Sequence, residues 1–166
     1  MLKPALSSQV RFEVDETYIG GVRHGKRGRG AEGKVAVVGV VQRRGKVMAT
    51  AVSNVKRSTL VPFITKNVAS DAVLYTDEFP SYDHITRFGY RHKRIQHSAK
   101  VYVSGQVHVN NIENFWSLVK RGISGVYHAV SPKYLQSYLN EYAFRYNHRN
   151  DETPMFELFL NRIQVS

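Results

Sequence analysis

The sequence contains no cysteine among its 166 residues. Disulfides and thiolate metal sites are therefore excluded, which is consistent with a cytoplasmic protein. No run of about 18 apolar residues occurs, so no segment is predicted to span a bilayer. Acidic residues are also few, because 13 Asp and Glu stand against 24 Lys and Arg and give a formal net charge of +11.

This positive charge predicts a polyanionic partner. A basic domain of this size attracts polyanions, of which nucleic acid is the commonest. Basic residues gather in two stretches, at 23–34 and at 87–100. Neither stretch has the wide apolar face of an amphipathic membrane helix, so duplex phosphates are the favoured ligand and a membrane is not an expected partner. The alternatives are a basic protein that is merely soluble, and one that binds an anionic membrane surface.

Hydrophobic periodicity predicts strands followed by helices. Residues 10–19 alternate, with Val14 on an apolar face and Glu13 and Asp15 on a polar face, as in a half-buried strand. Further strands are predicted at 34–42, 47–52, 72–76 and 90–97. Helices are predicted at 58–68 and 111–124, followed by two more that open at 131–132 and 153–154. The stretch 82–88 is too short to assign.

This order predicts the fold class before any motif is considered. Three consecutive strands exclude a pure alternation of strands and helices, so the sheet is expected to be mixed. A helix then returns the chain to a fourth strand that lies parallel to the first. This is the ribonuclease-H-like, or integrase-like, topology of an α/β protein. We expect one domain over 10–166, with C-terminal helices from about residue 131 and an N-terminal extension at 1–9.

Three acidic residues are candidates for a metal site. Asp15 lies on the polar face of the first strand, and Asp77 lies at the carboxyl end of the fourth, where α/β sheets place ligands. Glu113 lies on the predicted helix 111–124, beside its apolar stripe. Three carboxylates can hold two Mg²⁺ or Mn²⁺ ions for in-line attack on phosphorus.

Each acid also has an ordinary structural interpretation. Asp15 could cap a strand end, Asp77 could begin a turn, and Glu113 could be favourable charge at a helix N-terminus. Glu16 and Glu78 neighbour the chosen aspartates but should point to the opposite faces of regular strands. Trp116, on the helix 111–124, could stack on a base, yet its place on the apolar stripe favours core packing.

Three segments resemble a known family. They are VDETYIGG (14–21), YTDEFPSY (75–82) and HVNNIENFWSLVKRG (108–122), and SPKYLQSYLNEYAFRYNHR (131–149) also matches. Together they resemble the integrase-like catalytic domain of bacterial insertion-sequence transposases of the DDE superfamily, in its ISXO2-like branch. The resemblance runs from about residue 10 to the end of the sequence.

The resemblance implies a mechanism and a set of partners. Asp15, Asp77 and Glu113 correspond to the catalytic metal ligands, and Lys120 to a residue that holds transposon-end DNA. The implied reaction is Mg²⁺-dependent cleavage at element ends, followed by transfer of the 3′-hydroxyl ends into target DNA. The implied partners are double-stranded DNA and further copies of the chain, in the bacterial cytoplasm at the nucleoid. The zinc-ribbon module that precedes this domain in full-length members is not found upstream, as expected of a truncated copy or an excised domain.

Other basic residues are predicted to contact DNA. They are Arg121 beside Lys120, Arg27, Arg29 and Lys34 in the first basic stretch, and Lys93 and Arg94 in the second. Two alternatives stay open for the function. One is a nuclease of the same topology that does not transpose, and the other is a DNA-binding remnant of a transposase whose acids no longer act.

Overall fold

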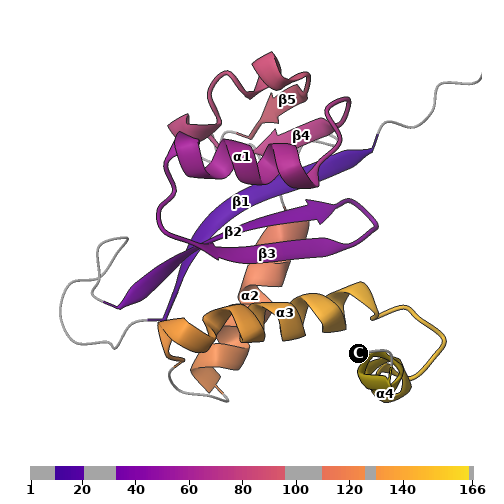
Figure 1. The fold of residues 1–166 in the computed structure, drawn as a ribbon. Helices are drawn as coiled ribbons and strands as arrows, with labels where there is room; N and C mark the ends of the chain where they lie inside the picture. Colours follow the sequence, from indigo (N-terminus) through magenta and orange to yellow (C-terminus); the bar gives the residue numbers. More distant parts are fainter. Residues whose placement is uncertain (1–9, 21–32, 96–109, 126–129, 165–166) are drawn as a thin grey trace, which may run out of the picture.

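A computed structural model describes residues 10–20, 33–95, 110–125 and 130–164 of the chain (Figure 1). The strands are β1 (Arg11–Gly20), β2 (Lys34–Gln42), β3 (Val47–Val52), β4 (Val73–Thr76) and β5 (Arg91–Arg94). The α-helices are α1 (Arg57–Asn67), α2 (Asn110–Gly125), α3 (Pro132–Asn147) and α4 (Met155–Gln164). Two short 3₁₀ helices, η1 (Pro80–Tyr82) and η2 (Ile85–Phe88), occupy the stretch that the sequence left unassigned.

The strands form one five-stranded mixed sheet in the order β3-β2-β1-β4-β5. β1 pairs antiparallel with β2 and parallel with β4, and β4 pairs parallel with β5. The predicted fold class is therefore confirmed: three antiparallel strands come first, and the chain then crosses through α1 to parallel strands. The predicted N-terminal extension 1–9 lies outside the described residues.

Helices cover both faces of this sheet, so β1 is buried on both sides (Figure 1). On one face, Val14 packs in a core cluster with residues of α1 and the two 3₁₀ helices. On the other face, Ile19 packs in a cluster with the apolar stripe of α2 and with α3. The prediction of a half-buried β1 was wrong beyond Arg11, which is exposed: α2 lies against the polar face, where Glu13 is fully buried and Asp15 is partly buried.

The outer edge of the sheet at β3 is closed by side-chain amides of α3. Asn147 accepts a hydrogen bond from Val47 N at 2.6 Å and donates one to Val47 O at 2.9 Å. Gln136 accepts from Ala51 N at 2.9 Å and donates to Ala49 O at 3.2 Å. The two amides thus pair with backbone groups that an edge strand would otherwise offer to another strand.

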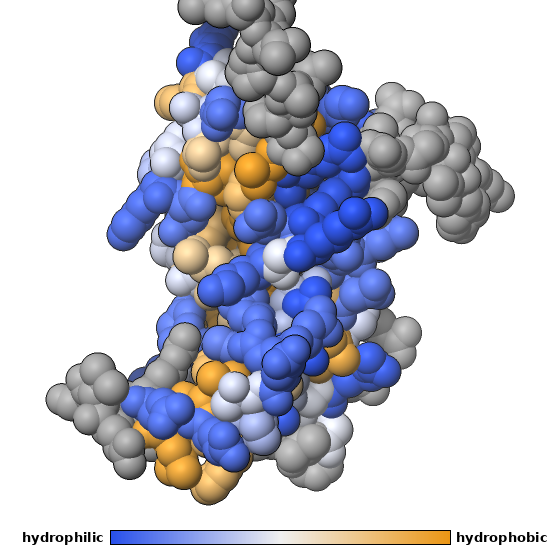
Figure 2. Space-filling model, turned by 90° about the vertical axis from the view of Figure 1, so that its right-hand side faces the viewer, coloured by the Kyte–Doolittle hydropathy of each residue, from blue (hydrophilic) through white to orange (hydrophobic). Residues whose placement is uncertain are grey.

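The C-terminal helices were predicted, but they are not equally buried. Leu135 and Leu139 of α3 belong to the core, whereas the apolar residues of α4 remain largely exposed, with Phe156 at 70% and Phe159 at 53%. α4 meets α3 through an edge-to-face contact between Phe159 and Phe144, with ring centroids 6.5 Å apart. On the face shown in Figure 2, hydrophilic side chains cover most of the surface, with hydrophobic patches among them. Among the described helices, none combines the length and apolar character that a bilayer crossing requires.

Candidate metal centre

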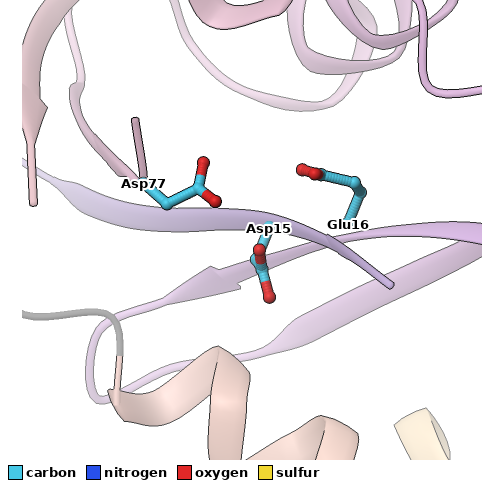
Figure 3. A group of neighbouring side chains, drawn as sticks. All are labelled: Asp15, Glu16 and Asp77. Carbon is cyan, nitrogen blue, oxygen red and sulfur yellow. The ribbon is translucent and has the colours of Figure 1, made fainter. Parts of the chain in front are cut away.

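Two neighbouring parallel strands bring Asp15 and Asp77 together. The pairing of β1 with β4 ends at Glu13 opposite Tyr75. Asp15 lies two residues beyond this last pair on one strand, and Asp77 lies two residues beyond it on the other. Their carboxylates, with that of Glu16, each place one oxygen within 4.8 Å of the others (Figure 3). We call these three residues the carboxylate cluster.

Glu16 is a member that the sequence analysis set aside. As alternation along a strand predicts, its side chain leaves β1 on the opposite side from Asp15 (Figure 3). The side chain is nevertheless close to both aspartates, because β1 and β4 are no longer paired at this level and the sheet opens. The hydroxyl of Tyr82, a buried residue of η1, donates a 2.7 Å hydrogen bond to Glu16 Oε2 and fixes its direction. Glu16 was not predicted as a member because the sequence does not show where the pairing of β1 with β4 ends.

Backbone and side-chain contacts hold the Asp77 segment in place. Phe79 N donates to Asp77 Oδ1 at 2.9 Å, so Asp77 does begin a turn, as its structural interpretation proposed. The hydroxyl of the buried Thr76 donates to the Asp77 carbonyl at 2.8 Å. This hydroxyl oxygen of Thr76 also lies 2.8 Å from His92 Nε2. Burial lowers the pKa of His92, which favours its neutral form beside Thr76. These contacts hold Asp77 at the end of β4, where its carboxylate is close to those of Asp15 and Glu16.

Burial and neighbouring negative charge make Asp15 a much weaker acid than usual. Burial, the largest cause, and the negative charges of Glu16, Asp77 and, more weakly, Glu113 together raise its pKa from 3.8 to about 7, against a backbone hydrogen bond at Glu16 that lowers it. Burial and the neighbouring charges penalise the ionised form. A cation among the carboxylates would remove that penalty.

Of the three predicted ligands, Glu113 lies farthest from the carboxylate cluster. It lies in the first turn of α2 with an exposed side chain, outside the carboxylate cluster. Its charge still acts on Asp15, since it contributes to the raised pKa of that group. The structure therefore brings together two of the three predicted ligands and sets the third at the rim.

α2 is joined to the cluster through Trp116. The ring is buried in the core, as predicted, but its Nε1 also donates a 3.1 Å hydrogen bond to Asp15 Oδ2. The indole lies directly over Gly39 of β2, where an added Cβ would come within 2.6 Å of Trp116 Cζ2. Its place on the apolar stripe gave no sign of this polar contact, which depends on the register between α2 and β1.

The predicted DNA-binding residues fall into two groups. Lys120 and Arg121 lie exposed on α2, and Lys34 begins β2. Loss of solvent lowers the pKa of Lys120, the charge of Asp15 raises it, and that of Lys34 lowers it, so Lys120 lies within electrostatic reach of both.

The second group, Lys93 and Arg94, lies on β5. Arg94 is in register with Thr76, next to Asp77, and pairs with Asp83. Both side chains are exposed. Arg27 and Arg29 lie outside the described residues.

The donor set fits a hard divalent cation. All the cluster ligands are carboxylate oxygens, which suit Mg²⁺ and Mn²⁺ better than softer metals. Their spacing and the raised pKa of Asp15 show that the folded chain holds these oxygens together against their mutual repulsion. Asp15 and Asp77 would hold such an ion, with Glu16 as a further oxygen donor.

Comparisons with known proteins place the chain in a family. The family model described as "ISXO2-like transposase domain" matches residues 7–147. An uncharacterized transposase-like protein of Haemophilus influenzae is 34% identical over 102 residues, which cover 61% of this chain and 81% of that protein. The crystal structure of the catalytic core domain of BIV integrase superposes with a TM-score of 0.57 at 11% identity, covering 93% of this chain and 96% of that one. This last likeness concerns the fold alone.

Proposed function

Because the chain belongs to the family of ISXO2-like transposase domains, we propose that it is the catalytic core of a DNA transposase. In this proposal Asp15, Asp77 and Glu113 hold Mg²⁺ or Mn²⁺, and two ions are expected. The observation that carries it is that carboxylate oxygens of Asp15 and Asp77 lie within 4.8 Å of each other, beyond the carboxyl end of β4.

The reaction is cleavage of phosphodiester bonds at element ends and transfer of the ends into target DNA. Bound ions of this kind activate an attacking hydroxyl and stabilise a leaving oxygen on phosphorus. In this proposal the reaction takes place at the carboxylate cluster, beyond the last paired residues of β1 and β4. Lys120 in this proposal binds a substrate phosphate, which is supported by its position on α2 within electrostatic reach of Asp15.

Duplex DNA is the proposed partner, and two groups of basic residues near the site are proposed to bind it. Lys120, Arg121 and Lys34 form one basic group, and Lys93 and Arg94 form another beside Asp77. Phosphate contacts of this kind give affinity without sequence specificity. We include Arg27 and Arg29 in the DNA-binding set on charge alone. Assembly of several copies on paired DNA ends, in the cytoplasm at the nucleoid, belongs to the same proposal.

The first prediction concerns metal-dependent DNA cleavage. The purified chain should nick supercoiled plasmid DNA with Mg²⁺ or Mn²⁺ and not with EDTA. Asp15→Asn, Asp77→Asn and Glu113→Gln should each lower the nicking rate by at least about a hundredfold, because each removes a ligand charge. Asp71→Asn is the matched control, since Asp71 is an exposed acid that precedes β4 at the other end of the strand.

Joining separates the transposase from a simple nuclease of the same fold. Duplex oligonucleotides with free 3′-hydroxyl ends are incubated with plasmid, and joined product is measured. A nuclease nicks but gives no joined product. Full metal-dependent nicking by Asp15→Asn or Asp77→Asn would contradict the assigned site, and absence of Mn²⁺ binding in calorimetry would favour the inactive remnant.

A further inference from the structure

Glu13 is a buried carboxylate outside the carboxylate cluster. It lies on β1 two residues before Asp15, on the side that faces α2, and its side chain is fully inaccessible to solvent. An ionised carboxylate in such a place needs compensating charge and hydrogen bonds. For Glu13, the hydrogen bonds come from the start of α2 and the opposite charge comes from Arg43.

Both carboxylate oxygens of Glu13 bind the beginning of α2. Oε2 accepts hydrogen bonds from Asn111 N at 2.8 Å and from Ile112 N at 3.1 Å. Oε1 accepts from Asn111 Nδ2 at 2.7 Å. The first backbone N–H groups of a helix have no partner within the helix, and a capping group normally comes from a residue just before it. Here a strand almost a hundred residues earlier in the chain supplies the cap.

Arg43 supplies the opposite charge. Its Nε donates to Glu13 Oε1 at 2.9 Å, and its guanidinium lies 3.8 Å from the centroid of the Tyr75 ring on β4. Arg43 lies in the turn after β2, so the cap combines Glu13 of β1 with a turn residue that packs on β4. These contacts tie the position of the cap to the sheet.

The capped amides directly precede Glu113. Three residues beyond Glu113, Trp116 makes the second polar contact of α2 with β1, through Asp15. Glu113 therefore lies between two points at which the helix is fastened to the strand that carries Asp15. We propose that Glu13 is a positioning residue, which sets the place of Glu113 relative to the carboxylate cluster. This inference rests on the proposed function, in which Glu113 is a metal ligand.

A merely structural role for Glu13 makes a different prediction. If Glu13 only stabilises the fold, its loss lowers stability and leaves Mn²⁺ affinity unchanged in protein that is still folded. If Glu13 acts through Glu113, its loss weakens Mn²⁺ binding only while Glu113 is present. A double-mutant cycle on Mn²⁺ affinity separates the two roles.

The second prediction is therefore non-additivity in Mn²⁺ titration of the full chain. Glu13→Gln puts an amide N–H where oxygen now accepts from α2, and should weaken Mn²⁺ binding about tenfold, as loss of outer-shell partners does. Glu113→Gln should also weaken it. The double variant should bind Mn²⁺ as Glu113→Gln alone does, and amide exchange at Ile112 should be faster in Glu13→Gln while that at Val119 is unchanged.

Control variants keep the outcomes distinct. Tyr90→Phe removes one buried hydrogen bond, to Val68 O on the α1 side, and should leave Mn²⁺ affinity unchanged. Asn111→Ala removes only the contact with Glu13 Oε1, and should show the same non-additivity if Glu13→Gln does not fold. Wild-type affinity in Glu13→Gln, or losses that add in full, would overturn the positioning role alone. Unchanged affinity in Glu113→Gln would overturn the ligand role of Glu113 as well.

Discussion

Asp15 combines burial, a hydrogen bond from Trp116 and two acidic neighbours in one carboxyl group. Because its pKa is raised to about 7, the folded chain binds the proton of Asp15 more tightly than the unfolded chain does. The contribution of Asp15 to stability is therefore undiminished below its ordinary pKa of 3.8. It becomes a penalty as the pH rises toward about 7, where the group ionises in the folded state.

The third prediction follows from this sign. In EDTA, Asp15→Asn should raise the free energy of unfolding by about 1–3 kcal/mol near pH 8, where wild-type Asp15 is charged. Near pH 4 the variant should differ little, since an asparagine oxygen can still accept from Trp116. Urea titration at both pH values measures this, with Asp71→Asn as the exposed control. An equal effect at both pH values would show that charge is not the cause.

At the scale of elements, the geometry of the proposed site depends on the placement of α2. It is fastened to β1 by Glu13 at its start and by Trp116 one turn later, and its apolar stripe fills the core on that face. The close approach to the sheet is possible because β2 carries glycine at position 39. The geometry of the site thus depends on the absence of a side chain on a neighbouring strand.

The fourth prediction tests this close packing. Gly39→Ala should lower the free energy of unfolding by about 1–3 kcal/mol, because the new Cβ would overlap the Trp116 ring in a full core. Gly125→Ala is the matched control at the end of α2, where an added Cβ meets nothing within 4 Å. It should be neutral or stabilise by up to about 1 kcal/mol through helix propensity. Chemical denaturation of both variants gives the comparison, and equal destabilisation by the two would contradict the packing argument.

The sequence predicted the elements well because local periodicity determines them. β2 and β3 were predicted at their observed bounds, and the buried stripe of α2 was read from its spacing. Contacts between elements were harder to predict. The approach of Glu16 depends on where β1 and β4 cease to pair, and the cap that Glu13 provides depends on the register of α2 against β1. Neither quantity is encoded in a local pattern.

At the scale of the whole molecule, the two edges of the sheet differ. The β3 edge is closed by the amides of Gln136 and Asn147, whereas the β5 edge carries exposed basic residues (Arg91, Lys93 and Arg94). Charge on an edge strand opposes pairing with another strand, as does covering it. Charge protects the β5 edge, on the side proposed to meet DNA, and covering by side-chain amides protects the β3 edge.

The fifth prediction concerns the covered edge. The double variant Gln136→Ala/Asn147→Ala should expose the backbone groups of Val47, Ala49 and Ala51, and should associate through β3 at concentrations where the wild type does not. Light scattering after size-exclusion chromatography measures this. Arg145→Ala is the control, since it removes an exposed ion pair from the same helix without touching the strand. A double variant with the mass of the wild type would show that the amides are not needed to block association.

β1 lies at the centre of the sheet and carries two members of the carboxylate cluster. Local opening of a protein begins at edges and ends, and central strands separate only when the entire fold is lost. Fraying of β3 or β5 therefore leaves Asp15 and Glu16 where they are. An ion held there would keep these two ligands through such fraying, and an ion that binds only the folded chain would stabilise it against unfolding.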